Sequence, residues 1–390
     1  MSIQSPAAAT PARGDGPHPL VRAAMVLGLL FFFLLGVNGL GAGFKSLGHG
    51  VLETFFAATE NPFTALMVGI LATTLVQSSS VSTSLIVGLV AAPENPLPLA
   101  NAVPMIMGAN IGTTVTNTIV SIGHIARPEE FRRAFPVAIC HDFFNFMAVG
   151  ILLPLEMMTG FLRHSAEFLA GFVTDFGGMH YQSPVKGALK AGLRPVQDLF
   201  AAVAPPGRIQ AVLMIVFSIS LILVALMLLV RVMRAATESR VESLVSRGLG
   251  QPAILSMFVG VVVTVMVQSS SITTSLLIPL AGAGVITLKQ AFPITIGANI
   301  GTTITALLAA LAVTGVNAEA GITIALVHLL FNVTATAMIY PVKRIRMLPM
   351  RAARWLGEAA VESRQWAVFY VLVLFYLVPA FFAALDQMLG

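Results

Sequence analysis

Leu75 to Leu85 reads LVQSSSVSTSL, and Met266 to Leu276 reads MVQSSSITTSL. Each stretch is followed about thirty residues later by a second matching segment. The first of these is GANIGTTVT, from Gly108 to Thr116, and the other is GANIGTTIT, from Gly297 to Thr305. Both copies place uncharged polar residues inside apolar sequence, which is unusual unless those residues have a purpose in the fold or the function.

A third matching pair is HDFFN at 141–145 and HLLFN at 328–332. The three pairs are separated by 191, 189 and 187 residues, so the chain contains two copies of one unit. Repeated polar segments at membrane depth are how many transporters build one central binding site. The duplication therefore predicts a single site formed by both halves of the chain.

The composition indicates a membrane protein. Of 390 residues, 57% are apolar and only 10% are charged, and the mean hydropathy is +0.89. The single cysteine, Cys140, excludes an internal disulfide and a thiolate metal cluster. The isoelectric point of 9.7 does not indicate nucleic-acid binding, because the basic residues gather on one side of the predicted membrane.

Seven apolar segments are long enough to cross a hydrocarbon core of about 30 Å as helices. They are 20–41, 98–122, 131–157, 209–232, 287–314, 319–342 and 365–388. Two further stretches, 62–91 and 252–284, carry the QSSS motifs near their middles. Ser and Thr side chains compete for backbone hydrogen bonds, so we expect each helix to break there and each stretch to form a re-entrant hairpin with its tip near the bilayer centre.

The distribution of charge supports this topology. With the N-terminus on one side, that side receives 16 of the 22 Lys and Arg residues, and five of the other six lie in the linker 158–208. The positive-inside rule makes the first side cytoplasmic, which places the C-terminus on the extracytoplasmic side. Three crossings between the two hairpins make the hairpins enter from opposite faces, as in an inverted repeat.

The predicted fold is an all-α polytopic membrane protein with two inverted-topology repeats, each with a re-entrant helical hairpin, and an extra C-terminal transmembrane helix. In each repeat a span is followed by an interfacial segment (about 44–60 and 235–251), the QSSS hairpin, the GANIGTT helix and the HxxxN helix. The predicted segments are a disordered cytoplasmic tail (1–19), repeat 1 (20–157), an extracytoplasmic linker (158–208), repeat 2 (209–342), a basic cytoplasmic segment (343–364) and the last helix (365–390).

The chemistry of the motifs restricts the ligand. Around QSSS and GANIGTT there is no acidic or basic side chain, only hydroxyls, amides and backbone groups. Carbonyl and hydroxyl oxygens suit a sodium ion, and N–H groups at a helix N-terminus suit a small oxyanion. Burying a divalent anion without a counter-charge is prohibitively costly, so the cation is expected to come from outside the motifs, which is the physical logic of sodium coupling.

The doubled QSSS motifs, each followed by GANIGTT, resemble the type II sodium/phosphate cotransporters, as do EFRRAF at 130–135 and HDFFN at 141–145. The resemblance covers roughly 60–150 and 250–340. It implies sodium-coupled uptake of inorganic phosphate by alternating access, with both QSSS motifs at the midplane site. The phosphate-binding residues it implies are Gln77, Ser78, Ser79, Ser80, Gln268, Ser269, Ser270 and Ser271.

We expect further polar residues to bind sodium or line the site: Thr74, Ser82, Thr83, Asn110, Thr113, Thr114, Thr273, Thr274, Asn299, Thr302 and Thr303. A supporting layer would comprise His141, Asp142, Asn145, His328 and Asn332. Asp142 stands out because an acid inside a span is costly, although Leu329 replaces it in the second copy. A histidine such as His141 more often caps or braces a helix than binds a ligand directly.

The sequence thus predicts a transporter rather than an enzyme, with no cofactor, no transition metal and Na⁺ as the coupling ion. The expected partners are inorganic phosphate, sodium ions and the lipid bilayer, with no nucleic acid and with homodimerisation left open. The short linker lacks a disulfide pair and an N-x-S/T sequon, which fits a bacterial member in the inner membrane. The alternatives are a sodium-coupled carrier of sulfate or a carboxylate and, less favoured, an intramembrane serine hydrolase, although neither QSSS lies in a G-x-S-x-G elbow.

Overall fold

The computed structural model describes residues 19–47, 59–92, 96–176, 184–205, 207–248, 250–312 and 317–389, and every regular element in these ranges is a helix. The first half contains α1 (Pro19–Leu47), α3 (Pro62–Val76), α4 (Ser79–Val90), α5 (Leu99–Gly112), α6 (Val115–Ile122) and α7 (Pro128–Thr159). Two helices, α8 (Phe161–Phe176) and α9 (Pro184–Val203), connect it to the second half.

The second half contains α10 (Arg208–Gly248), α11 (Ala253–Val267), α12 (Ser270–Ser275), α13 (Leu277–Gly282), α14 (Leu288–Ala312) and α15 (Ala318–Ile339). The chain continues with α16 (Lys343–Glu362), α17 (Gln365–Leu372), the π-helical turn η1 (Val373–Leu377) and α18 (Val378–Leu389). Most of the predicted disordered tail, and much of the first predicted interfacial segment, lie outside the described residues.

Six helices in the described part of the chain are long and apolar enough to cross a membrane. They correspond to six of the seven predicted spans and lie at 20–40, 128–159, 208–229, 288–311, 318–339 and 365–386. The exception is 98–122, which is two helices, α5 and α6, separated at Thr113 and Thr114. The second predicted interfacial segment, 235–251, is mostly the continuation of α10, which runs unbroken to Gly248.

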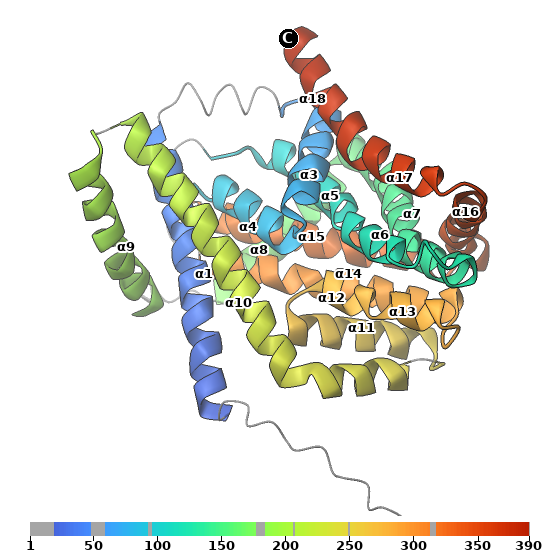
Figure 1. Cartoon of the computed structure of the whole chain (residues 1–390). Helices are drawn as coiled ribbons and strands as arrows, with labels where there is room; N and C mark the ends of the chain where they lie inside the picture. The colour runs from blue at the N-terminus through green and yellow to red at the C-terminus, as the bar shows by residue number, and fades with distance from the viewer. Residues whose placement is uncertain are drawn as a thin grey trace, which may run out of the picture.

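Each QSSS stretch folds into two consecutive helical arms. In repeat 1 the arms are α3 and α4, of 15 and 12 residues, and in repeat 2 they are α11 and the pair α12 and α13 (Figure 1). At 1.5 Å per residue, an arm of 15 residues is about 22 Å long, which is shorter than the hydrocarbon core. These lengths are what the hairpin hypothesis requires.

Glycines of the GANIG segments bring each first arm against the following helix. A Cβ on Gly108 of α5 would overlap the Leu66 carbonyl of α3, and a Cβ on Gly297 of α14 would overlap the Met257 carbonyl of α11. Only glycine permits this backbone contact, so any larger residue would separate the arm from its neighbour. In both repeats the glycines of the motif therefore serve helix packing.

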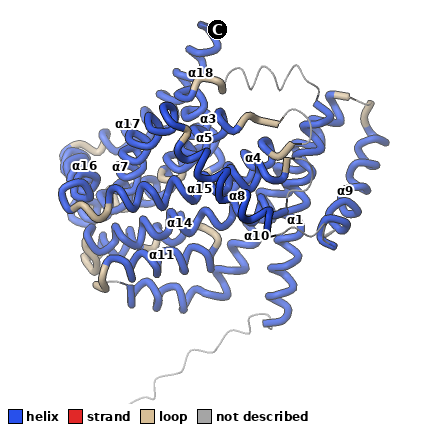
Figure 2. Tube along the Cα trace, turned by 180° about the vertical axis from the view of Figure 1, so that it is seen from behind, coloured by secondary structure: helices blue, strands red, loops and turns tan. Residues whose placement is uncertain are grey.

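Helix α1 packs along α10 through its own glycines. A Cβ on Gly36 would lie 2.7 Å from the side chain of Ile222, and one on Gly43 would lie 2.8 Å from that of Ile215. Figure 1 shows the two helices side by side, and Figure 2 shows the same pair from behind with α9 at the outer edge. Leu189 of α9 is buried in a small apolar cluster with residues of α1 and α10.

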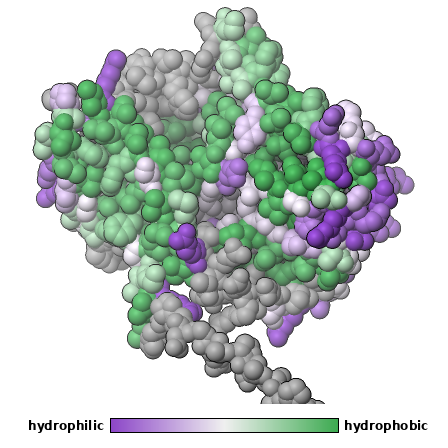
Figure 3. All heavy atoms as spheres, viewed as in Figure 1, coloured by the Kyte–Doolittle hydropathy of each residue, from purple (hydrophilic) through white to green (hydrophobic). Residues whose placement is uncertain are grey.

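In the described residues, the predicted linker forms α8 and α9 and the predicted basic segment forms α16, and these helices have apolar sides. In α8, Leu162, Ala166 and Ala170 are fully buried in the main core. The basic α16 packs on α7, where a Cβ on Gly357 would lie 2.6 Å from the Pro136 ring. Figure 3 shows an otherwise largely apolar face with hydrophilic residues gathered near the edge where α16 lies. The amphipathic spacing of apolar residues explains why these segments form helices.

Candidate functional site

The two QSSS motifs form the same turn. Helix α3 ends at Val76, and Gln77 adopts a left-handed conformation with φ 54° while its N–H donates to the Thr73 carbonyl at 2.7 Å. Ser78 is extended, and its Oγ accepts a hydrogen bond from the Val81 N–H at 3.4 Å to cap α4. An αL residue followed by a serine cap ends one helix and begins the next.

Repeat 2 reproduces this turn. Gln268 has φ 57°, and the Oγ of Ser269 accepts from the Ile272 N–H at 3.4 Å. Gln77 and Gln268 are the two non-glycine residues with positive φ in the described part of the chain. Backbone strain of this kind gathers at functional sites, where the surroundings hold it in place. Its presence at one matched position in both repeats marks the two turns as the leading candidate site.

One pocket of about 430 Å³ lies between the two turns. All eight residues of the predicted phosphate-binding set line it. Val76 and Val81 flank the first motif, and α10 contributes Leu223, Leu226, Met227 and Arg231. Residues almost 200 positions apart in sequence thus face a shared cavity, which is the arrangement that the duplication predicts.

The pocket presents polar groups at the beginnings of helices. Ser79 and Ser80 are buried in the first turn of α4, and Ser270 is buried in the first turn of α12. The N–H groups of a first helical turn lack carbonyl partners within the helix, and the helix dipole adds partial positive charge there. In α4 these donors and the serine hydroxyls together suit a small oxyanion.

The pocket also contains a charged residue that the motif analysis missed. Arg231 is exposed and belongs to α10, outside both QSSS motifs. The sequence offers one signal for it, since it is a basic residue at the end of the apolar segment 209–232. Arg231 was not predicted as a site residue because it is distant in sequence from both QSSS motifs.

The predicted sodium-binding residues on the arms lie behind the tips rather than in the pocket. Thr83 Oγ1 donates to the Ser79 carbonyl at 2.8 Å, and Ser82 Oγ donates to the Ser78 carbonyl at 3.2 Å. In repeat 2, Thr273 Oγ1 donates to the Ser269 carbonyl at 3.2 Å and accepts from Thr264 Oγ1 at 2.9 Å. These bonds brace the arms close to each turn.

Thr274 connects the second hairpin to repeat 1. Its Oγ1 lies 2.9 Å from Asn117 Oδ1 on α6 and 2.8 Å from the Ser270 carbonyl. Ser275 Oγ also donates to Asn117 Oδ1, at 3.2 Å. By contrast, the buried hydroxyls of Thr73 and Thr74 on α3 have no hydrogen-bond partner among the described residues. Oxygen atoms in the first arm are therefore available to a ligand.

Four buried asparagines from the GANIG and HxxxN motifs join the two repeats. Asn299 Nδ2 donates to Asn145 Oδ1 at 3.0 Å, and Asn332 Nδ2 donates to Asn110 Oδ1 at 3.1 Å. Each bond runs between the two sequence repeats, so it joins motifs that are distant in the chain. None of the four lines the QSSS pocket. The two bonds link α14 to α7 and α15 to α5.

Asn145 also explains why α5 and α6 are separate. Its Nδ2 donates to the Asn110 backbone carbonyl at 3.0 Å, and the Thr114 N–H instead donates to Ile111 at 3.2 Å. The hydroxyls of Thr113 and Thr114 donate to the Ala109 and Ile111 carbonyls. A side chain that occupies a helix carbonyl interrupts the regular ladder.

The corresponding residues of repeat 2 stay inside one continuous helix. Thr302 Oγ1 donates to the Ala298 carbonyl at 3.1 Å, and Thr303 Oγ1 donates to the Ile300 carbonyl at 2.8 Å. The four GANIGTT threonines therefore bond to their own helices, and none of them lines the QSSS pocket. Their expected role at the site stays a prediction.

The intramembrane acid is bonded to the C-terminal helix. Asp142 is fully buried on α7, and its Oδ2 accepts a hydrogen bond from the Tyr370 hydroxyl of α17 at 2.7 Å. The motif analysis missed Tyr370, which lies 228 residues away in sequence. His141 and His328 are also buried, and neither lines the pocket. The expected role of these three side chains as a supporting layer stays a prediction.

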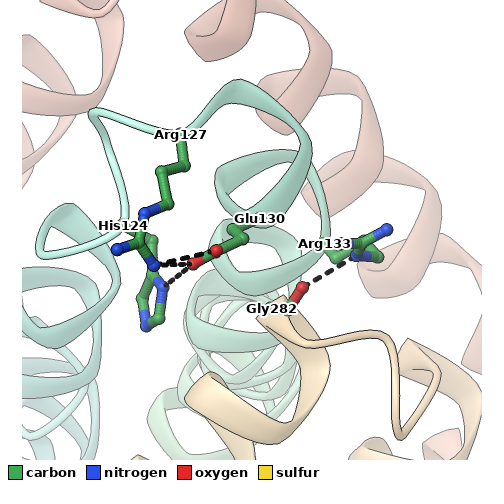
Figure 4. A network of polar contacts seen from close by, with 5 residues as sticks. All are labelled: His124, Arg127, Glu130, Arg133 and Gly282. Atoms are coloured by element: carbon green, nitrogen blue, oxygen red, sulfur yellow. Dashed lines mark hydrogen bonds and ion pairs between the residues drawn. The ribbon is translucent and has the colours of Figure 1, made fainter.

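A polar network joins the start of α7 to the second hairpin (Figure 4). Arg133 Nε donates to the Gly282 carbonyl at the end of α13, at 2.9 Å. Nearby, Glu130 accepts from Arg127 Nη1 at 2.9 Å and lies 3.0 Å from His124 Nδ1. Arginine at a helix C-terminus is favourable electrostatically. Arg133 thus links the start of α7 to the end of a hairpin arm.

Comparison with known proteins identifies the family. The model of the Na⁺/Pi-cotransporter family matches residues 32–183 and 221–348, which together contain both QSSS motifs and both asparagine pairs. The chain belongs to the Na⁺/Pi-cotransporter family. Family membership and the six apolar helices together make it a multi-pass, all-helical membrane protein. No solved structure matches this chain.

Curated members of the Na⁺/Pi-cotransporter family align along most of the chain. Sodium-dependent phosphate transport protein 2B of Bos taurus is 31% identical over 91% of the chain and 63% of its own length. Protein 2A of Ovis aries is 32% identical over 94% of the chain and 68% of its own length. Protein 2B of Homo sapiens is 30% identical over 92% of the chain and 64% of its own length. The chain therefore spans about two thirds of these relatives.

Proposed function

We propose that this protein is a secondary active transporter that couples sodium entry to the uptake of inorganic phosphate. The observation that carries the proposal is the single pocket lined by both QSSS motifs. Family membership supports it, because the similar bovine, ovine and human proteins are named sodium-dependent phosphate transport proteins. A serine hydrolase has no such support.

Phosphate in this proposal occupies the QSSS pocket. Its oxygens would accept hydrogen bonds from the serine hydroxyls, the glutamine amides and the free N–H groups at the start of α4. The eight motif residues are uncharged, so they cannot neutralise a divalent anion. Bound sodium would supply positive charge near the anion, which explains why the two ligands bind together.

Sodium in this proposal binds oxygen atoms of the hairpin arms. The unpartnered, buried hydroxyls of Thr73 and Thr74 lie on α3, within four residues of Gln77. Buried polar atoms are normally satisfied, so such hydroxyls indicate a missing partner. The other predicted lining residues of the arms bond to backbone carbonyls, and sodium would have to share or replace these bonds.

The transport cycle is proposed to be alternating access by two inverted repeats. The short arms of each QSSS turn would enter the membrane as re-entrant hairpins from opposite faces, with their tips at the midplane. The N-terminus would lie in the cytoplasm and the C-terminus outside, in a bacterial inner membrane. The charge asymmetry of the sequence supports this orientation.

Uptake into proteoliposomes tests the function. Purified full-length protein should accumulate radiolabelled phosphate when an inward sodium gradient is present, with lithium a weaker substitute and potassium ineffective. Unlabelled sulfate and dicarboxylates should compete poorly. Uptake that is equally fast in sodium-free buffer with a proton gradient would contradict sodium coupling, and strong competition by sulfate would reassign the substrate.

Matched serine variants test the site. Ser79→Ala and Ser270→Ala each remove one buried hydroxyl from the pocket and should raise the phosphate or sodium concentration for half-maximal uptake about five- to 150-fold, which corresponds to a loss of about 1–3 kcal/mol. Ser363→Ala, at the end of α16 and outside the pocket, should behave as wild type. Unchanged kinetics in both pocket variants would mean that the turns are structural.

A further inference from the structure

Helix α10 presents one face to the QSSS pocket. Leu223, Met227 and Arg231 follow one another at intervals of four residues, and Leu226 lies beside them on the same side of the helix. Arg231 is therefore one turn beyond Met227, about 6 Å further along the helix axis. The pocket thus has an apolar wall that ends in a guanidinium group.

Arg231 is the one charged residue among the described residues that line this pocket. It is exposed, and it makes no ion pair with the described residues. The eight QSSS residues supply hydrogen bonds but no charge. A guanidinium that has no ion-pair partner among the described residues, at the end of an uncharged polar pocket, attracts anions and can bond two oxygens of one oxyanion at once.

We propose that Arg231 recognises the anion at the mouth of the QSSS pocket and selects a doubly charged tetrahedral oxyanion over a singly charged one. The inference rests on the proposed function, since it deepens the role of the same pocket. Arg231 lies on the side that the charge distribution makes cytoplasmic. It would act on the anion as it leaves toward, or returns from, the cytoplasm.

The geometry explains why this charge stands at the mouth and not among the tips. A cation fixed beside the serines would hold a dianion too tightly for release and would compete with sodium for the same space. Arg231 is exposed one helical turn beyond Met227, so its guanidinium group is hydrated. Its attraction for the anion is therefore moderate and is screened by salt. Sodium then remains necessary for full binding at the turns.

Equilibrium binding to the purified full-length protein in detergent tests the proposal, because both faces are accessible there. The probe is radiolabelled inorganic phosphate, with and without sodium at constant ionic strength. Arg231→Gln should weaken sodium-dependent phosphate binding about five- to thirtyfold, which extends below the usual range for a hydrogen bond to a charged group because the residue is exposed. Arg231→Lys should fall between wild type and Arg231→Gln, since it keeps the charge and loses the planar fork.

The matched control is Arg208→Gln. Arg208 is an exposed arginine at the other end of the same helix and does not line the pocket. This variant makes the same change in net charge and should bind phosphate as wild type does. Equal loss in both variants would overturn the proposal, because net charge alone would then explain it.

The pH profile separates recognition from a structural role. Wild-type affinity for total phosphate should increase from about pH 6 to about pH 8, as the phosphate group loses its second proton. Arg231→Gln should flatten this increase, whereas a misfolded fraction would lower the amount bound and leave the profile unchanged. Wild-type affinity should also fall as choline chloride is added at constant sodium.

The outcomes distinguish the two proposals. If wild-type protein binds phosphate only with sodium, and Arg231→Gln matches its affinity and pH profile, the role of Arg231 is refuted and the transport proposal stands. If wild-type protein shows no sodium-dependent phosphate binding, the transport proposal fails and this inference fails with it. If Arg231→Gln does not fold, Arg231→Lys and the salt titration decide. The role is refuted if Arg231→Lys binds phosphate with the wild-type affinity and pH profile, and if wild-type affinity does not change as choline chloride is added.

Discussion

Replacing Gln77 with glycine separates the backbone of the first QSSS turn from its side chain. Gln77 has φ 54°, a left-handed conformation that costs an ordinary residue about 1–2 kcal/mol and glycine almost nothing. Glycine in turn loses more freedom on folding, about 0.5–1 kcal/mol. The Gln77 side chain makes no hydrogen bond with the described residues, so the net change in the free energy of unfolding should be an increase of about 0–1.5 kcal/mol.

The second turn provides the contrasting case. Gln268 Nε2 donates to the Val265 carbonyl at 2.7 Å, and its Oε1 accepts from Thr305 Oγ1 at 3.0 Å. Losing two such bonds costs about 1–3 kcal/mol in total, and the middle of this range exceeds the middle of the range for the net gain from glycine, which is about 0–1.5 kcal/mol. Gln268→Gly should therefore be less stable than wild type, although it makes the same substitution at the same position of the repeat.

The assay combines thermal unfolding of the purified full-length variants in detergent with phosphate uptake in proteoliposomes. Gln77→Gly should unfold at the wild-type temperature or above and should nearly lose uptake, because the pocket has lost an amide. Gln77→Ala keeps the strained backbone and should be no more stable than wild type. Wild-type uptake by Gln77→Gly would refute a role for the amide, and a Gly variant less stable than Gln77→Ala would refute the strain argument.

Two further predictions concern the support and the topology. Tyr370→Phe should lower stability by about 1–3 kcal/mol, because Asp142 loses the 2.7 Å bond to the hydroxyl, whereas Tyr376→Phe should change it little; equal unfolding temperatures for both would show that the bond contributes nothing. In a background without the native cysteine, an impermeant thiol reagent added outside the cell should label Arg194→Cys and leave Arg344→Cys unlabelled. Labelling of both positions from one face would mean that a crossing has been miscounted.

The composition of the pocket could be predicted because duplication carries spatial information. Two matched polar segments in an apolar chain cannot both face lipid, so they must face protein or a cavity. In a pseudo-symmetric fold the simplest shared place is the centre, where the residues from Gln77 and from Gln268 onward do line one cavity. The helix break could be predicted too, since three consecutive serines favour capping over helix interior.

Other features depend on neighbours that no local pattern reveals. The interruption after Gly112 arises because Asn145, on another helix, occupies the Asn110 carbonyl. Tyr370 reaches Asp142 from the last helix of the chain. In the sequence, Arg231 is a basic residue at the end of an apolar segment, and only the structure shows that α10 brings it to the pocket between the QSSS turns. Each is a contact between distant segments, and a single sequence offers only the residue types and not the pairing.

The two copies of GANIGTT adopt different backbone arrangements. The first copy is broken into α5 and α6, whereas the second lies within the continuous α14, although the seven letters are the same. The difference must therefore come from the surroundings. Asn145 donates to a backbone carbonyl of the first copy, whereas its counterpart Asn332 donates to the Asn110 side chain and to the His328 carbonyl of its own helix. One hydrogen bond contributes about 0.5–1.5 kcal/mol net, so the bond from Asn145 offsets the helix hydrogen bond that the Asn110 carbonyl does not receive from Thr114.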